Sequence, residues 1–199
     1  MTTEKSGEIV GLLLAGGKGT RMGGQDKGLL TWKGEPMAER VYRALSTVVS
    51  PVLISANRSL VFYEKIAPGH VYPDTPDNTH NGPLAGLLRG LIEAEGLGAQ
   101  AVLVSPCDTP DITPATLSAL VEAWKIQPLR PVVAECEGRI HPLHGVYPVS
   151  VLIQLSEWLA SGNRRVMKFA ESVNAVVVDC PEAEAAFQNR NRPEDLAGK

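Results

Sequence analysis

The 199-residue sequence is 44% hydrophobic and 21% charged, so it can form one globular core of ordinary size. Its formal net charge of −3 argues against a nucleic-acid binder, because such proteins release counterions through a basic face. The three cysteines are widely separated, which favours a reducing cytoplasm over a disulfide framework or a zinc site. No apolar run is long enough to span a membrane and no export signal is recognised, so we expect no membrane partner.

Strands and helices are predicted to alternate through the first half of the chain. Residues 9–15 form a short apolar run that ends in glycines, which is typical of a strand buried on both faces. Pro36 stands where a first helical turn tolerates proline, and apolar residues then recur at helical spacing through residue 49. The same reasoning predicts strand 51–56, helix 60–66, strand 71–72, a turn-rich loop over 73–82, helix 83–94 and strand 101–105.

The second half is less regular but continues the alternation. It predicts a helix capped by Thr113 that ends near residue 126, strands 131–137 and 144–147 bent around Gly138, helices 150–160 and 164–173, strand 175–178 and a closing helical turn over 193–197. This alternation indicates an α/β fold whose ligands bind at the carboxyl ends of the strands. No repeat or shift in composition marks a boundary, so residues 1–199 are expected to form one domain.

A glycine-rich loop follows the first strand. Glycines at positions 16, 17, 19, 23 and 24 are interleaved with Lys18 and Arg21 and followed by Lys27. Glycine lets backbone N–H groups approach phosphate oxygens, while the cations offset the charge of a triphosphate. A tight surface turn with solvated basic residues is the alternative, but it seldom needs so many glycines and cations after a central strand.

Two common nucleotide motifs do not fit this loop. A Walker loop beginning at Gly19 would need lysine after Gly24, where the sequence has Gln25. The dinucleotide fingerprint would need a third glycine at Met22, and the second strand ends without an acidic ribose ligand. The loop therefore predicts a phosphate site of another kind.

Two aspartates that follow strands are candidate metal or nucleotide ligands. Asp108 comes just after strand 101–105, and Mg²⁺ needs only one or two carboxylates when phosphate oxygens and water complete its shell. A turn role ahead of Pro110 is the alternative for Asp108. Asp74 is the second candidate, whereas Asp111 is interpreted as a turn residue.

Three other reactive side chains are given minor roles. Cys107 has no neighbouring histidine to lower its pKa and is interpreted as a packing residue. His141 and His144 have no acidic or cysteine ligand beside them, so a structural or acceptor-contacting role is favoured over a metal pair.

Six motifs in this order resemble the molybdenum cofactor guanylyltransferases: Leu14-Ala15-Gly16-Gly17, Arg21-Met22-Gly23, Asp26-Lys27, Gly82-Pro83-Leu84-Ala85-Gly86, Pro106-Cys107-Asp108-Thr109-Pro110 and Asn189-x-Asn191-x-Pro193-Glu194. The resemblance runs from Gly11 to Leu196. It implies a monomeric Rossmann-like nucleotidyltransferase fold with a mostly parallel sheet and helices on both faces. It also implies that residues 8–112 bind the nucleotide and that residues 113–199 complete the sheet and the acceptor site.

The activity that this resemblance implies is Mg²⁺-dependent transfer of GMP from GTP to molybdopterin carrying molybdenum, with release of pyrophosphate. Transient contacts with molybdenum-insertion proteins and with molybdoenzymes or their chaperones are expected. The implied nucleotide ligands are Leu14, Ala15, Gly16, Gly17, Lys27, Ser55, Asp74 and Asp108, and the implied catalytic residues are Arg21, Lys27 and Asp108, of which Asp108 holds the metal. The implied acceptor ligands are Gly82, Arg164, Arg165, Asn189 and Asn191.

The sequence departs from the family pattern at two positions. Ser55 stands where the family commonly has asparagine, and Arg192 stands where a threonine would cap the closing helix. Three alternatives remain open: a cytidylyltransferase for the same pterin, a sugar-1-phosphate nucleotidyltransferase, and a noncatalytic GTP-binding protein that delivers the cofactor.

Overall fold

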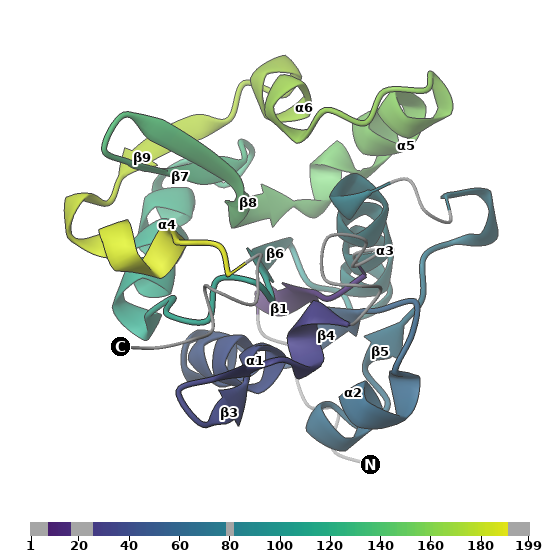
Figure 1. Ribbon diagram of the computed structural model, residues 1–199. Helices are drawn as coiled ribbons and strands as arrows, with labels where there is room; N and C mark the ends of the chain where they lie inside the picture. Colours follow the sequence, from purple (N-terminus) through teal and green to yellow (C-terminus); the bar gives the residue numbers. More distant parts are fainter. Residues whose placement is uncertain (1–7, 17–25, 79–81, 191–199) are drawn as a thin grey trace, which may run out of the picture.

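The computed structural model describes residues 8–16, 26–78 and 82–190, and within them the chain forms a seven-stranded sheet beside a two-stranded hairpin (Figure 1). The strands of the sheet are β1 (Ile9–Leu14), β4 (Val52–Ser55), β5 (Val71–Tyr72), β6 (Ala101–Pro106), β7 (Val132–Cys136), β8 (Arg139–Pro148) and β9 (Val176–Asp179). Their order is β5-β4-β1-β6-β8-β7-β9. The hairpin consists of β2 (Thr31–Trp32) and β3 (Glu35–Pro36).

Only β8 runs against its neighbours among the described strands of the large sheet. β1 pairs in parallel with β4 and β6, β4 with β5, and β7 with β9, whereas β8 is antiparallel to both β6 and β7. The carboxyl ends of β1, β4 and β6 therefore meet at one edge of the sheet. The prediction of a mostly parallel α/β sheet is confirmed.

Helices connect the strands. The α-helices are α1 (Met37–Val48), α2 (Leu60–Ile66), α3 (Pro83–Gly96), α4 (Pro114–Ile126), α5 (Leu152–Ala160) and α6 (Val166–Ser172). The 3₁₀ helices are η2 (Lys27–Leu29), η3 (Pro76–Asn78), η4 (Val149–Val151) and η5 (Pro181–Phe187). None of the helices in the described part of the chain is both long and apolar enough to cross a membrane.

The core lies in two layers, one on each face of the sheet. Ile9 and Leu13 of β1 pack into a cluster with α1 and α4, whereas Val10 and Leu12 pack into a second cluster with α3 and α5. This alternation follows from the period of two in a strand and explains why the first apolar run is continuous. Helices therefore cover both faces, as predicted.

The β2–β3 hairpin was not predicted from the sequence. Lys33 and Gly34 both have positive φ, at 48° and 86°, which makes a two-residue turn whose twist matches its flanking strands. Each strand has only two residues, so no alternating pattern can develop. Pro36 is the last residue of β3 and not part of the first helical turn, and α1 begins at Met37.

The second β-hairpin is longer than predicted. A turn at Glu137 and Gly138, both with positive φ, starts β8 at Arg139 instead of near residue 144. The helix expected from residue 164 begins at Val166, and η5 was not predicted. The helical turn expected over 193–197 lies outside the described residues.

Candidate active site

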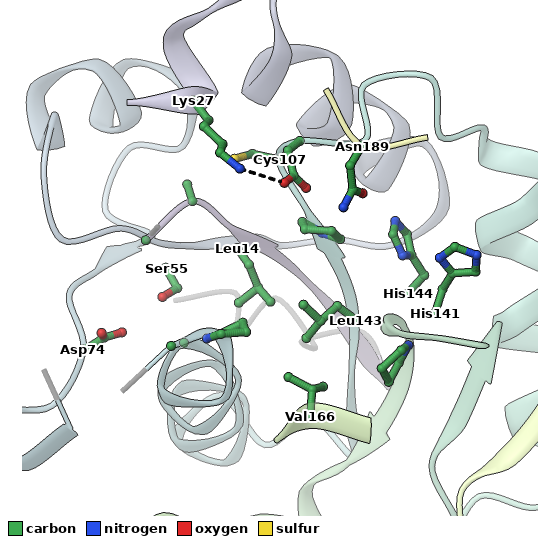
Figure 2. A pocket seen from close by; sticks show the side chains of 18 of the residues that line it. Leu14, Lys27, Ser55, Asp74, Cys107, His141, Leu143, His144, Val166 and Asn189 are labelled. Carbon is green, nitrogen blue, oxygen red and sulfur yellow. Dashed lines mark hydrogen bonds and ion pairs between the residues drawn. The ribbon is translucent and has the colours of Figure 1, made fainter. Parts of the chain in front are cut away.

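A pocket of about 550 Å³ opens at the carboxyl ends of the parallel strands. One side of the pocket is lined by residues at the ends of β1, β4 and β6 and by residues that follow these strands in the chain. The β7–β8 hairpin lines the other side, where Figure 2 shows His141, Leu143 and His144. The lining residues are Leu14, Ala15, Gly16, Lys27, Ser55, Asp74, Gly82, Pro83, Gly86, Pro106, Cys107, Asp108, Arg139, Ile140, His141, Pro142, Leu143, His144, Val166 and Asn189.

The start of the glycine loop is fixed by the neighbouring strands. Ala15 donates its backbone N–H to the carbonyl of Ser55 at 2.8 Å, and Cys107 donates to the carbonyl of Leu14 at 3.0 Å. A Cβ at Gly16 would lie 3.1 Å from Nδ2 of Asn57, so glycine permits a close approach there. Leu14 and Ala15 are therefore hydrogen-bonded to the segments on both sides where they border the pocket.

Lys27 and Asp108 face each other from opposite segments. Lys27 Nζ lies 3.3 Å from Asp108 Oδ2, and both side chains are about one-fifth exposed, at 22% and 18%. The preceding Asp26 is the N-cap of η2 and accepts the backbone N–H of Gly28 at 3.1 Å. Tyr63 donates its hydroxyl to the same Asp26 oxygen at 2.8 Å, which ties the segment that carries Lys27 to α2.

Asp74 is held by Asn57 through two hydrogen bonds. Asn57 Nδ2 donates to Asp74 Oδ2 at 2.8 Å, and the backbone N–H of Asp74 donates to Asn57 Oδ1 at 2.9 Å. The sequence did not predict this partnership, although Asn57 follows β4 just as Asp74 follows β5. The pair positions the Asp74 carboxylate at the pocket edge beside Ser55.

The β7–β8 hairpin supplies a wall of the pocket through residues 139–144 of β8. His144 Nε2 lies 2.9 Å from Thr109 Oγ1, and the Thr109 hydroxyl donates to the carbonyl of Pro106, so the imidazole donates through Nε2. Burial, with a smaller contribution from His141, lowers the pKa of His144 to about 3, so its ring is neutral. His141 stacks on Phe187 with 4.5 Å between ring centroids. Both histidines thus make packing or hydrogen-bond contacts and also line the pocket, so the structural and the acceptor-contacting roles both stay predictions.

The remaining predicted ligands divide into three groups. Gly82 and Asn189 line the pocket with the nucleotide ligands already described. Arg164 and Arg165 do not line it, and Arg164 instead donates to the carbonyls of Leu159 and Asn163, both at 2.7 Å. The predicted ligands outside the described residues are Gly17, Arg21 and Asn191.

Cys107 is a packing residue, as predicted. Its side chain is buried, and burial together with the nearby Asp108 and Asp26 charges raises the pKa of its thiol far above the usual range. Burial therefore disfavours the thiolate, which is the nucleophilic form of cysteine.

The donor groups in the pocket limit the kind of metal ion that it could hold. Within the described part of the chain, no group of three or more histidine, cysteine, aspartate and glutamate side chains is arranged to hold a metal by itself. A zinc-type cage is therefore not formed there. The Asp108 carboxylate in the pocket lining is instead the type of oxygen donor that suits Mg²⁺ bound together with a nucleotide.

Fold and pocket together define the class of protein. A glycine loop after a buried strand, a facing lysine and carboxylate, and a two-sided pocket at the carboxyl edge of a Rossmann-like sheet are features of nucleotidyltransferases.

Comparison with known proteins identifies the family. Residues 11–176 match the MobA-like NTP transferase domain. A molybdenum cofactor guanylyltransferase of Cereibacter sphaeroides is 41% identical, with coverage of 95% of this chain and 94% of that protein. The corresponding protein of Serratia proteamaculans is 40% identical, with coverage of 94% and 92%. The chain belongs to the molybdenum cofactor guanylyltransferase family.

Solved structures agree on the fold. Molybdopterin-guanine dinucleotide biosynthesis protein A from Archaeoglobus fulgidus superposes with a TM-score of 0.78 at 19% identity, covering 94% of each chain. A 4-diphosphocytidyl-2C-methyl-D-erythritol synthase from Anaerococcus prevotii superposes with a TM-score of 0.72 at 12% identity, covering 94% of this chain and 92% of that one. At these identities the likeness shows the fold alone.

Proposed function

We propose that the protein transfers GMP from GTP to molybdopterin carrying molybdenum, releasing pyrophosphate. The observation that carries the proposal is the Lys27–Asp108 pair, which lies in the pocket lining together with Gly16 in a member of the guanylyltransferase family. The relatives named above are molybdenum cofactor guanylyltransferases, and 95% of this chain aligns with the first of them.

The two ends of the pocket suit two different substrates. Ser55 and Asp74 lie at one end and His141, His144 and Asn189 at the other, with Lys27 between them (Figure 2). We assign the nucleotide base to the Ser55 end, where the backbone of Leu14 and Ala15 is hydrogen-bonded to the segments on both sides. We assign the pterin to the hairpin end, where Ile140 and Leu143 give an apolar surface. The reacting phosphates then lie near Lys27 and Asp108.

The chain's own residues position charge more than they move protons. The acceptor phosphate is an anion and attacks the α-phosphorus directly, so a strong general base is not required. Lys27 offsets negative charge on the triphosphate and on the leaving pyrophosphate. Asp108 would hold Mg²⁺, which supplies charge neutralisation and orientation of the phosphates when bound.

The competing assignments differ in base and acceptor. The preference for guanine or cytosine would depend on hydrogen bonds between the base and side chains at the Ser55 end of the pocket. The Ser55 hydroxyl can both donate and accept such a bond. A sugar 1-phosphate would leave the apolar hairpin wall without a partner, which favours the flat pterin as acceptor. We further propose that the enzyme acts as a cytoplasmic monomer that hands its product to molybdoenzymes or their chaperones.

The experiment is a pyrophosphate-release assay with Mg²⁺ and each of the four nucleoside triphosphates, run once with molybdenum-loaded molybdopterin and once with hexose 1-phosphate as acceptor. We expect pyrophosphate release with GTP and with none of the other three nucleotides. This release should be lost when a chelator is added and should recover when Mg²⁺ is added back. Release with CTP instead would identify a cytidylyltransferase, and release with hexose 1-phosphate would identify the sugar enzyme. GTP binding by calorimetry without turnover of any acceptor would identify a delivery protein.

A further inference from the structure

The carboxylate of Asp111 is surrounded by donors from separate segments. Trp32 Nε1 lies 3.0 Å from both of its oxygens, Lys33 Nζ lies 2.8 Å from Oδ1, and Arg190 donates to Oδ2 at 3.1 Å. Burial raises the pKa of Asp111, but the hydrogen bonds from Lys33, Trp32 and Arg190 outweigh it and leave the pKa below its usual value. We call these four residues the Asp111 cluster. None of them lines the pocket.

Arg190 is the most constrained member of the Asp111 cluster. Its guanidinium lies over the ring of Trp32, with 4.1 Å between Cζ and the ring centroid, and binds Asp111 at the same time. Its backbone N–H donates to the carbonyl of Asp108 at 2.8 Å. One residue therefore holds two parts of the loop that follows β6.

Each segment that meets at the Asp111 cluster also sends a polar side chain into the pocket. Lys27 stands five residues before Trp32, Asp108 three residues before Asp111, and Asn189 directly before Arg190. The C-terminal segment runs from η5 toward the ends of β1 and β6 (Figure 1), where Asn189 joins the lining. The cluster thus connects three contributions that are far apart in the sequence.

We propose that Arg190 is a positioning residue, which fixes Asp108 and Asn189 relative to each other and to Lys27 through its contacts with Trp32, Asp111 and the Asp108 carbonyl. The part of this inference that concerns catalysis rests on the proposed guanylyl transfer. Arg190 is not a catalytic residue, because it acts through the segments it holds and does not line the pocket. Lysine would keep the charge opposite Asp111 but lose the planar group that stacks on Trp32.

The test compares Arg190→Ala, Arg190→Lys and Trp32→Leu with the matched control Arg130→Ala. Arg130 also binds through its guanidinium, donating to the carbonyl of Asn174 at 2.9 and 2.6 Å, but it lies outside the pocket lining. The expected results separate catalysis from nucleotide binding. For Arg190→Ala we expect kcat to fall about 10- to 100-fold and the KM for the acceptor to rise, because small misplacements of reacting groups have effects of this size. The dissociation constant of GTP should change about twofold or less, since Leu14 to Gly16 are held by other contacts. Arg190→Lys should recover part of the lost kcat, and Arg130→Ala should keep the wild-type values.

Hydrogen exchange in the full-length protein gives a readout that does not depend on turnover. The backbone amide at position 190 should lose protection in Arg190→Ala and Trp32→Leu but keep it in Arg130→Ala. Wild-type kcat and acceptor KM in both Trp32→Leu and Arg190→Lys would overturn the proposal, even if Arg190→Ala does not fold. If the wild-type protein releases no pyrophosphate with any acceptor, the proposed function fails. The exchange measurement then tests the positioning role by itself: unchanged protection of amide 190 in Arg190→Ala and Trp32→Leu overturns that role, and lost protection supports it.

Discussion

Lys27 Nζ lies 3.3 Å from Asp108 Oδ2, although 81 residues separate the two in the sequence. The contact places a cation and a carboxylate together in the lining of the pocket, to which Gly16 and Pro106 at the end of β6 also belong. A triphosphate brought there with a divalent cation would exchange this contact for one between Lys27 and phosphate and one between Asp108 and the metal. The first two predictions test the two halves of that exchange.

Asp108→Asn should lower kcat for guanylyl transfer about 100- to 1,000-fold, the range found when one group that stabilises transition-state charge is removed. The amide keeps the shape of the side chain but loses the charge that would hold Mg²⁺. The rate of pyrophosphate release against Mg²⁺ concentration checks this. Asp179→Asn, exposed on β9 and outside the pocket lining, is the control and should behave as wild type.

Lys27→Met should weaken binding of GTP and slow transfer by about tenfold or more each, because one positive charge facing the triphosphate is lost. Lys27→Arg should recover part of both, since the charge returns with a different shape. Calorimetry with GTP and steady-state kinetics measure the two effects separately. Equal affinity of the Lys27→Met and wild-type proteins for GTP would contradict the assignment of Lys27 to the phosphates.

The free energy of unfolding should fall as the pH drops from about 6.5 toward 3, in part because of His144. Burial lowers the pKa of the folded His144 to about 3 from an ordinary value of 6.5. Between these values the unfolded chain binds a proton that the folded chain does not, so acid favours unfolding by at most about 1.4 kcal/mol per pH unit from this group. Urea titrations across the range, repeated on His144→Gln, should show a shallower slope in the variant. An unchanged slope would mean that other groups cause the acid sensitivity.

Gly86→Ala should impair the nucleotide end of the pocket. A Cβ there would lie 2.7 Å from Ser55 Oγ and 2.9 Å from Leu14 Cδ2, so both pocket side chains must move. We expect weaker GTP binding and a free energy of unfolding lower by about 1 to 3 kcal/mol, as for other overpacked sites. Gly96→Ala in the same helix is the matched control, because nothing lies within 4 Å of its added Cβ. Thermal melts and GTP calorimetry on both variants check this. The prediction is contradicted if Gly86→Ala and Gly96→Ala have the same melting temperature and the same affinity for GTP.

Much of the nucleotide end of the pocket was predictable because its residues follow strands directly. Leu14 is the last residue of β1 and Asp108 comes two residues after the end of β6, and parallel strands bring such ends to one edge. Apolar runs and glycines are local signals, so they mark these positions without knowledge of the rest of the chain.

The full extent of the hairpin wall and the contacts of the Asp111 cluster were not predictable for a physical reason. The β8 residues that line the pocket follow a turn at Glu137 and Gly138 that sets their register, and the β-bulge between Val133 and Ala134 shifts it again. Asp111 does stand in a turn, as predicted, yet its carboxylate binds residues 79 positions away in both directions along the chain. A contact between residues so far apart in the sequence leaves no local sequence pattern that would predict it.

The sequence by itself determined the α/β alternation, the glycine loop and the carboxylates that follow the strands, because each depends on residues close together in the chain. Tertiary structure alone decided which of them meet. It brought Lys27 to Asp108, paired Asn57 with Asp74 and placed Arg190 between Trp32 and Asp111. These arrangements depend on the packing of distant segments and on burial of their charged groups, and neither can be read from a window of sequence.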